Sequence, residues 1–562
     1  MKRLGEILGD ISGVEPEVVN EAIKAGLERG DRVGEALMRS REIDEFDILK
    51  ALGIQFGMEV VYALPPEINT DFTSRLPISF LKKNKMVPIT TPEGSFLAIN
   101  DPTLFQSVDE VRRVLGVEEL KSVLCPHQAI IKAINYSYDM TLDTAEEVMQ
   151  DIDEEDPERL FSEIEEVGDL LDDTSASPVI RLVNLMFSQA VRDGASDIHI
   201  EPYQNSMKIR QRLDGILYDM FSPPKHVQSS LISRVKIMAK LDIAEKRLPQ
   251  DGRIELKVGN KEIDVRVSTL PTSFGERVVL RLLDKSSVLI SLIDLGMPAD
   301  RLEKFSKQIK SPNGIILVTG PTGSGKTTTL YAALTSINNT DINIITVEDP
   351  VEYRISGIGQ VQVNPKIDLT FASGLRSIVR QDPDVILVGE IRDTETAEIA
   401  IQSALTGHLV FSTLHTNDAA SAITRLRDMG IEPFLIASSI NAILAQRLIR
   451  ILCENCKEAY LPDKAELRKI GLNPEKMEGK KLFREVGCSK CHHTGYRGRY
   501  GIFELLLMTK ELKTLVMQTS DANAIKQFAV AKNGMITLNR DGAMKVLQGQ
   551  TTIEEVYRVC QA

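Results

Sequence analysis

One eight-residue segment restricts the folds available to this chain more than any other feature. Residues 320–327 read GPTGSGKT, which matches G-x-x-x-x-G-K-[ST]; the apolar run Ile315–Thr319 precedes them and a helical stretch, Thr328–Ile337, follows. A buried strand, a glycine-rich turn and a helix in this order are typical of a phosphate-binding loop. The C-terminal half of the chain is therefore predicted to hold a parallel α/β sheet that binds a nucleotide.

The residue types in this loop predict how a phosphate is bound. The glycines let backbone N–H groups turn inward, and the following helix adds the positive end of its dipole. Lys326 is expected to reach the β- and γ-phosphates, and Thr327 to offer its hydroxyl to Mg²⁺. The predicted ATP-binding residues are Gly320, Pro321, Thr322, Gly323, Ser324, Gly325, Lys326, Thr327 and Thr328.

Two further apolar runs end in carboxylates. The run Val385–Val388 leads into Gly389 and Glu390, and the run Ile344–Val347 leads into Glu348. The carboxyl ends of parallel strands form the ligand-binding edge of such sheets. Glu390 is the candidate for polarising the attacking water or holding Mg²⁺ through a water, and Glu348 repeats the pattern. A purely structural role at a strand end is the alternative for Glu390.

Histidines bracket a third apolar run. His408 precedes Leu409–Leu414 and His415 follows it. Because His415 is expected at the same sheet edge, we predict that it senses the γ-phosphate or places the water. A hydrogen-bonded polar residue without a chemical role is the alternative.

Arginines before the nucleotide segment are candidates for the cations that phosphoryl transfer requires. Ring-forming ATPases often supply these cations from another domain or subunit. Arg266, Arg277 and Arg281 lie shortly before the nucleotide segment. Ordinary surface ion pairs are the alternative.

Four of the six cysteines form two C-x-x-C pairs. Cys453 and Cys456 are separated by 31 residues from Cys488 and Cys491. Two such pairs predict a closed Cys₄ zinc site with a structural role, and a redox dithiol or a metal-free cluster are the alternatives. Cys125 and Cys560 stand alone and are interpreted as small hydrophobic or incidental residues.

Composition shifts along the 562 residues suggest four parts. Residues 1–140 form a small N-terminal domain, helical and α+β, whose first sixty residues contain a degenerate repeat with a period of 29. Residues 141–176 form an acidic linker, 177–295 a second α/β domain, and 296–562 the nucleotide domain. The nucleotide domain includes the metal module at about 450–500.

The net charge of −13 comes from one place. The stretch Asp143–Asp173 holds fifteen acidic residues and one arginine, Arg159, so the rest of the chain is almost neutral. A basic footprint for nucleic acid is not visible at this level. No run approaches the ~18 apolar residues of a membrane span, and the N-terminus lacks a secretory apolar region. A cytoplasmic location is therefore expected.

These segments together resemble the secretion ATPase superfamily, the cytoplasmic motors of type II secretion and type IV pilus assembly. The resemblance covers nearly the whole chain, and within the superfamily it is strongest to the type II secretion branch. Pilus retraction ATPases resemble the core but characteristically lack the metal module and the long N-terminal region. The motifs that carry the resemblance are 320–327, Thr346–Tyr353, Asp384–Glu390 and Thr406–Thr416, and the branch is indicated by Val265–Pro271, Gly275–Asp284, Val486–Cys488 and Gly495–Arg499.

The resemblance implies a homo-hexamer with a PAS-like domain followed by a RecA-like ATPase domain. It implies that Arg266 and Arg281 approach the phosphates, with help from Arg497, and that Glu390 and Glu348 are the family's acidic catalytic positions. It also implies that residues 1–140 dock onto the cytoplasmic part of an inner-membrane platform protein, and that a polytopic platform protein is a further partner. The repeat faintly resembles modules that bind cyclic di-GMP, but Ser40 or Arg41 stands where their second half carries glycine. Protein docking is therefore ranked above this ligand.

The predicted function is an ATP-hydrolysing ring motor that drives pseudopilus assembly and protein export, peripheral to the inner membrane through its partners. Pilus extension is the first alternative. A nucleic-acid motor is a second, which the near-neutral charge opposes because phosphate contacts need clustered Lys and Arg. A scaffold that binds ATP without hydrolysing it is a third, which the acidic strand ends oppose.

Overall fold

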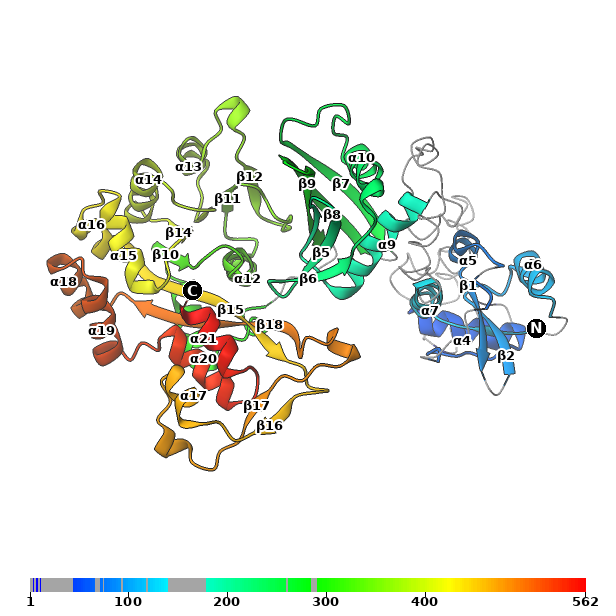
Figure 1. Ribbon diagram of the computed structural model, residues 1–562. Coiled ribbons are helices and arrows are strands. Elements are labelled where there is room, and N and C mark those ends of the chain that lie inside the picture. Colours follow the sequence, from blue (N-terminus) through cyan, green and yellow to red (C-terminus); the bar gives the residue numbers. More distant parts are fainter. Residues whose placement is uncertain are drawn as a thin grey trace. The chain divides into compact units, whose positions relative to one another are not determined.

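The computed structural model describes residues 4, 7–8, 11, 44–65, 71–73, 75–91, 94–117, 120–139, 178–258, 261–284 and 291–561. The chain divides into two compact units, Met1–Ser286 and Ser287–Ala562 (Figure 1). Most of the predicted N-terminal repeat and the whole acidic linker at 141–176 lie outside the described residues. Within the described residues, no helix is both long and apolar enough to cross a membrane.

The first part of the N-terminal unit is a small α+β fold. Its sheet has the order β1-β2-β3, with β1 and β2 antiparallel and β2 and β3 parallel. Apolar side chains from the strands and helices, such as Leu81, Met86 and Ile130, form one core. The α+β fold predicted for this region is confirmed. Its elements are α4 (Glu45–Phe56), α5 (Ile78–Asn84), β1 (Met86–Thr91), β2 (Gly94–Ile99), α6 (Phe105–Leu115), β3 (Lys121–Leu124) and α7 (His127–Asp139).

The second part of this unit is a six-stranded antiparallel sheet with the order β6-β5-β4-β9-β8-β7. Buried positions alternate along β5, as expected when one face of a strand is covered. The covered face packs on α9 and α10 (Figure 1). The elements are α9 (Pro178–Asp193), β4 (Asp197–Pro202), β5 (Met207–Leu213), β6 (Ile216–Phe221), α10 (Gln228–Met238), β7 (Gln250–Val258), β8 (Lys261–Thr272) and β9 (Gly275–Asp284).

The C-terminal unit is built on a seven-stranded sheet with the order β12-β11-β13-β14-β10-β15-β18. All neighbouring pairs are parallel except β15 and β18. One core lies between the sheet and α11 and α12, and another between the sheet and α13–α16 with α18 and α19. The predicted RecA-like α/β fold is confirmed.

The bounds of these elements follow the chain order. They are α11 (Ala299–Gln308), β10 (Gly314–Thr319), α12 (Lys326–Ile337), β11 (Ile344–Glu348), β12 (Gly359–Gln362), α13 (Phe371–Ile378), β13 (Val385–Val388), α14 (Thr394–Leu405), β14 (Leu409–Leu414), α15 (Ala419–Asp428), α16 (Pro433–Ser439), β15 (Ile440–Leu452), β16 (Glu458–Tyr460), α17 (Lys464–Lys469), β17 (Leu482–Arg484), β18 (Tyr496–Leu507), α18 (Lys510–Gln518), α19 (Ala522–Asn533), α20 (Leu538–Leu547) and α21 (Ile553–Gln561).

The four predicted site segments meet at one edge of this sheet. β10, β11, β13 and β14 run in the same direction, so their carboxyl ends share an edge. The residues at these ends are Thr319, Glu348, Val388 and Leu414. The phosphate-binding loop and the segments with Glu390 and His415 continue from there.

The strands β15 and β18 form a long antiparallel pair that joins the sheet to the cysteine segment. Leu452 at the end of β15 pairs with Tyr496 at the start of β18. Residues 453–495, which contain all four clustered cysteines and the short sheet of β16 and β17, lie between these paired ends. The cysteine module is therefore an insertion in a hairpin of the main sheet.

Candidate nucleotide site and cysteine cluster

The phosphate-binding loop connects β10 to α12 as predicted. Gly320 has φ +151°, and a Cβ atom there would lie 2.4 Å from the carbonyl oxygen of Gln446, so only glycine fits. α12 begins at Lys326, whose Nζ atom donates to the carbonyl oxygens of Gly320 (2.9 Å) and Pro321 (3.1 Å). In this structure the ammonium group of Lys326 is hydrogen-bonded to these carbonyls and not to a phosphate. The neighbouring Pro321, Thr322, Gly323 and Thr327 are exposed.

Glu390 and His415 come together at the adjacent strand ends. The Nε2 atom of His415 lies 3.1 Å from Oε2 of Glu390. The other carboxylate oxygen of Glu390 forms an ion pair with the guanidinium of Arg392. Arg392 was missed by the sequence analysis, and its only signal was its place two residues after Glu390. The Glu390 side chain is 15% exposed while His415 is 51% exposed, so the pair borders solvent.

Electrostatics keep Glu390 in its ionised form. Burial acts to raise the pKa of this carboxyl, but the hydrogen bond and charge of Arg392 and the contact with His415 lower it below its ordinary value. Burial lowers the pKa of Lys326, and the nearby Glu390 charge opposes this shift. The two predicted residues therefore lie within electrostatic reach of each other. A carboxylate at this place can accept a proton from water.

Hydrogen bonds with β14 fix the segment that carries Glu390. The Oγ1 atom of Thr413 in β14 donates to the carbonyl oxygen of Gly389 at 2.7 Å. The backbone N–H of Ile391 donates to the carbonyl oxygen of Thr413 at 3.1 Å. Gly389 and Ile391 flank Glu390, so β14 holds its main chain on both sides.

Glu348 is placed at the same sheet edge, but its carboxylate is engaged inside the protein. The residue is 3% exposed. It accepts hydrogen bonds from the hydroxyls of Tyr331 in α12 and Thr346, and from Nε2 of Gln360 at 3.3 Å. These bonds tie the end of β11 to the helix that follows the phosphate-binding loop. Sequence reasoning could not show this burial, because a strand end reads the same whether it is open or covered.

The predicted arginines lie on the face of the antiparallel sheet opposite the one that packs on α9 and α10. Arg266 in β8 is directly opposite Arg281 in β9, which in turn is opposite Asp197 in β4. The Nε atom of Arg281 donates to Oδ1 of Asp197 at 3.0 Å. Arg277 pairs with Glu201, which Arg210 also contacts through two hydrogen bonds. The two buried carboxylates thus hold arginine side chains in place on this face.

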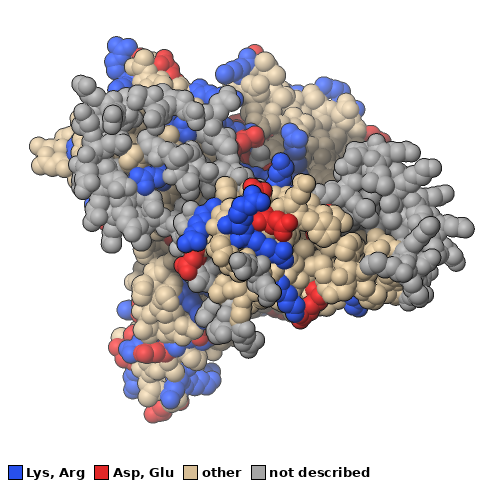
Figure 2. All heavy atoms as spheres, turned by 90° about the vertical axis from the view of Figure 1, so that its right-hand side faces the viewer, with Lys and Arg blue, Asp and Glu red and all other residues tan. Residues whose placement is uncertain are grey.

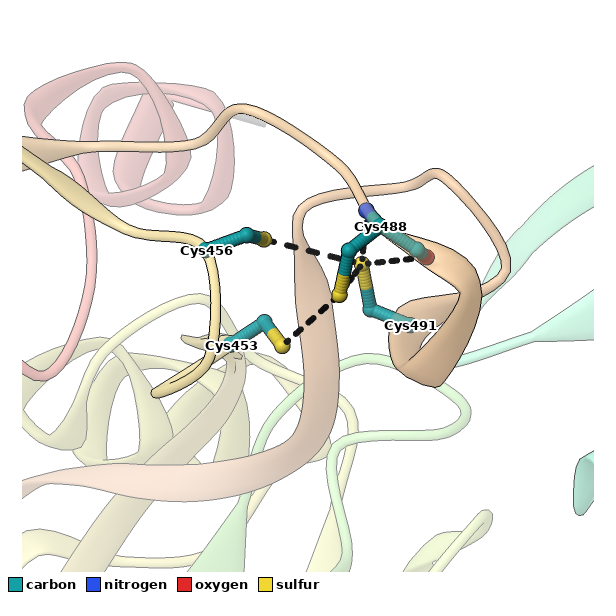
Figure 3. A group of neighbouring side chains, drawn as sticks. All are labelled: Cys453, Cys456, Cys488 and Cys491. Atoms are coloured by element: carbon teal, nitrogen blue, oxygen red, sulfur yellow. Dashed lines mark hydrogen bonds between the residues drawn. The ribbon is translucent and has the colours of Figure 1, made fainter.

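The four predicted cysteines form one cluster. Cys453 and Cys456 follow β15, Cys488 and Cys491 precede β18, and their sulfur atoms point toward one another (Figure 3). All four Sγ atoms lie within 4.8 Å of each other. Backbone N–H groups of Gly487, Cys488 and Gly495 donate to cysteine sulfurs at 3.1–3.3 Å. Such N–H···S contacts favour thiolates.

The spacing of these sulfurs can be compared with a metal site. Pairs of Sγ atoms are 3.9 Å (Cys453–Cys488), 3.8 Å (Cys456–Cys491) and 3.7 Å (Cys488–Cys491) apart. Four sulfurs placed tetrahedrally at ~2.3 Å from a zinc ion are about 3.8 Å from one another. The cluster is therefore compatible with a tetrahedral zinc ion. The other two cysteines are elsewhere, with Cys125 fully buried in the N-terminal core.

Comparison with protein families now identifies the chain. Residues 172–558 match the family described as "Type II/IV secretion system protein". The chain belongs to this family. A second match, "MshEN domain", covers residues 56–144. The family match spans the phosphate-binding loop at 320–327, so the predicted ATPase is confirmed, and nucleotide with Mg²⁺ is implied.

Curated relatives agree with this assignment. The chain is 50% identical over 490 residues to type II secretion system ATPase E of Vibrio cholerae, covering 86% of this chain and 96% of that protein. It is 47% identical over 486 residues to type II secretion system protein E of Pseudomonas aeruginosa, with 86% and 96% covered. It is 42% identical over 557 residues to the type IV pilus assembly ATPase PilB of Myxococcus xanthus, with 99% and 98% covered. The prediction of a type II secretion ATPase is confirmed by these names, with pilus assembly as its secondary alternative.

A solved structure supports the fold. The X-ray structure of the ATPase DotB of Legionella pneumophila matches with a TM-score of 0.51 and 22% identity, over 70% of this chain and 98% of that one. Basic and acidic side chains are interspersed among the described residues in the view of Figure 2.

Proposed function

We propose that this secretion-family ATPase hydrolyses ATP to drive pseudopilus assembly and protein export in type II secretion. The observation that carries the proposal is the pairing of Glu390 with His415 and Arg392, within electrostatic reach of Lys326 at the phosphate-binding loop. An ionised carboxylate beside a phosphate-binding ammonium group supplies both parts of a hydrolytic site.

Each residue has a separate task in this proposal. Lys326 leaves the loop carbonyls and binds the β- and γ-phosphates of ATP. Glu390 accepts the proton of the attacking water, and His415 orients Glu390 or the water from the other side. Glu348 supports the site through its hydrogen bond with Tyr331, which fixes α12 against β11. Thr327 is exposed at the start of α12 and would hold Mg²⁺, which neutralises phosphate charge when bound.

The arginines require a larger assembly. We infer that Arg266 and Arg281 reach the phosphates in a homo-hexamer, where a neighbouring subunit or domain offers them to the nucleotide. Asp197 keeps the side chain of Arg281 ordered before that encounter. Arg497 lies exposed at the start of β18, close in sequence to the cysteine cluster, and is proposed as a further cation.

The cysteine cluster is proposed to hold a structural zinc ion. Three pairs of its sulfurs are 3.7–3.9 Å apart, as a tetrahedral site requires, and a Cys₄ set leaves no coordination position for water or substrate. The ion would fix the ends of β15 and β18 relative to each other. It would therefore stabilise the fold without entering the reaction.

The proposed location is the cytoplasmic side of the inner membrane. Residues 1–140 would dock onto the cytoplasmic part of a platform protein, and the ring would act on a polytopic platform protein. Cyclic di-GMP remains ranked below a protein partner for the N-terminal region. Pull-down of membrane proteins with the full chain, compared with a chain lacking residues 1–140, tests this part.

A deletion strain tests the function directly. The strain is complemented with the wild-type gene, with Glu390→Gln, or with an empty vector, and extracellular proteins are compared with those retained in the cell. We expect export only with the wild-type gene. Normal export in the deletion strain would contradict the proposal.

Pilus assembly is the second candidate function. It is favoured by one observation, the match to a pilus assembly ATPase that extends over 99% of this chain. The same strains distinguish the two functions, because loss of surface pili with normal export would assign the motor to pilus extension.

A further inference from the structure

Thr319 occupies the junction between the phosphate-binding loop and the segment that carries His415. It is the last residue of β10, directly before Gly320, and its side chain is fully buried. β14 lies beside β10 and pairs Leu414 with Thr319, the last pair in this part of the ladder. His415 follows Leu414, so its position depends on what holds the chain beyond the strand end.

Beyond the last backbone pair of this ladder, the hydroxyl of Thr319 makes the hydrogen bonds between the two segments. The backbone N–H of Thr416 donates to Oγ1 of Thr319 at 2.9 Å. The same Oγ1 atom lies 3.0 Å from the carbonyl oxygen of Leu414 and 3.1 Å from that of Thr416. It also lies 2.7 Å from Oγ1 of Thr416. These contacts reach the residues on both sides of His415.

A count of donors shows what the contact requires. A threonine hydroxyl donates one hydrogen and accepts up to two. Thr319 accepts the N–H of Thr416, and its single hydrogen goes to one of three oxygen atoms, all on Leu414 or Thr416. The hydroxyl of Thr416 can in turn donate to the carbonyl oxygen of Asp418 at 3.0 Å. Asp418 caps α15 by accepting from Ser421, so the chain after His415 is fixed at its far end as well.

We propose that Thr319 is a positioning residue that holds His415 at Glu390 relative to the phosphate-binding loop. The side chain is attached to the residue before Gly320, and its hydrogen bonds end on the neighbours of His415. The 3.1 Å contact between His415 and Glu390 is thereby positioned relative to β10, the strand that leads into the phosphate-binding loop. This inference rests on the proposed role of His415 in hydrolysis.

The contact needs a hydroxyl and not only the volume of a side chain. Valine has the shape of threonine without the hydrogen-bonding oxygen, so Thr319→Val leaves the partly buried N–H of Thr416 without its acceptor. The main chain around His415 can then shift, while the sequence of the glycine-rich loop is unchanged. Serine keeps the oxygen and loses only a methyl group, so Thr319→Ser retains the contact.

The test compares kcat with nucleotide affinity in the purified full-length protein. Thr319→Val is expected to lower kcat at least about tenfold, because small misplacements of reacting groups are costly. The Kd of ADP is expected to stay within about threefold, and Thr319→Ser to recover most of the turnover. Thr514→Val is the matched control, since its hydroxyl donates only to the carbonyl of Lys510 within α18. Thermal unfolding of each variant identifies a general loss of structure.

A double-mutant cycle with His415→Ala separates positioning from folding. If Thr319 acts through His415, Thr319→Val lowers kcat no further in a chain that already carries His415→Ala. Equal losses in both backgrounds would overturn the inference, as would a parallel loss of kcat and ADP affinity, or a failure of Thr319→Ser to recover turnover. Full activity of Thr319→Val beside an impaired His415→Ala overturns this inference alone. Full activity of His415→Ala overturns the proposed role of His415 and the inference with it.

Discussion

The Nε2 atom of His415 lies 3.1 Å from Oε2 of Glu390, across the carboxyl ends of two adjacent parallel strands. The two residues are separated by 25 positions in the sequence, and neither is held by its own strand alone. Arg392 contacts the other oxygen of the same carboxylate. This arrangement leaves an ionised acid at the border of the site with solvent, and it determines the first two predictions.

Lys326→Ala and Glu390→Gln should separate binding from chemistry. Removing the ammonium group of Lys326 should abolish tight nucleotide binding, because this group is proposed to bind the phosphates directly. Glu390→Gln keeps the shape of the side chain but cannot accept a proton, so binding should persist while turnover falls by at least about 10²-fold. Equilibrium binding of a fluorescent ADP and steady-state hydrolysis measure the two effects. Near-normal hydrolysis by Glu390→Gln would refute the catalytic role.

Arg392→Gln should change the pH dependence of hydrolysis. The positive charge of Arg392 favours the carboxylate form of Glu390, so its loss raises the pKa of Glu390. The acidic limb of the kcat profile should therefore move to higher pH, while activity on the alkaline side of that limb depends less on the change. Arg376→Gln is a matched control, because Arg376 forms an exposed ion pair with Glu395. An unchanged limb in Arg392→Gln would show that Glu390 does not set it.

Arg281→Ala should lower turnover more than nucleotide affinity. Cations that act on the transition state contribute roughly 10³–10⁵-fold to kcat in related phosphoryl transfers, so a loss of at least about 100-fold is expected. The specific activity of the wild-type protein should rise with concentration as subunits assemble. Arg484→Ala, which removes an exposed ion pair with Glu458, should behave as wild type. A specific activity that does not change over the protein concentrations at which subunits assemble would contradict the proposal that one subunit offers its arginines to the nucleotide of another.

Replacing Cys453 and Cys456 by serine should release one zinc ion per chain and loosen residues 450–500. Binding of structural zinc contributes about 10–16 kcal/mol in small zinc peptides, whereas the larger unit here has its own cores. The main sheet should therefore stay folded while limited proteolysis cuts the module. Cys560→Ser, which changes a cysteine outside the cluster, is the matched control, and this variant should retain the zinc ion. Absence of zinc from protein purified without chelators would refute the site.

The phosphate-binding loop and the cysteine cluster could be predicted from sequence because their residues are close together in the chain and have fixed spacings. Gly320–Thr327 requires a strand before it and a helix after it, and the structure has both. Two C-x-x-C pairs can approach each other in few ways, and their sulfurs do meet. Local spacing therefore carried the strongest predictions.

The rest of the site depends on contacts between strands that no spacing reveals. Glu348 and Glu390 follow apolar runs of the same kind, yet Glu348 is buried against Tyr331 while Glu390 borders solvent. The difference comes from α12, which covers one strand end and not the other. Arg392 and Thr319 were missed for the same reason, since their importance lies in partners that belong to other segments. The roles predicted for Arg266 and Arg281 stay predictions.

The position of β18 has a consequence for synthesis of the chain. β15 pairs with β10 on one side and with β18 on the other, but 43 residues lie between the end of β15 and the start of β18. A ribosome-bound chain therefore exposes the hydrogen-bonding edge of β15, with its apolar side chains, until the cysteine module and β18 have emerged. Unpaired edges of this kind promote aggregation. If the four cysteines hold the proposed zinc ion, the ion would shorten the effective loop and favour early pairing of β18 with that edge.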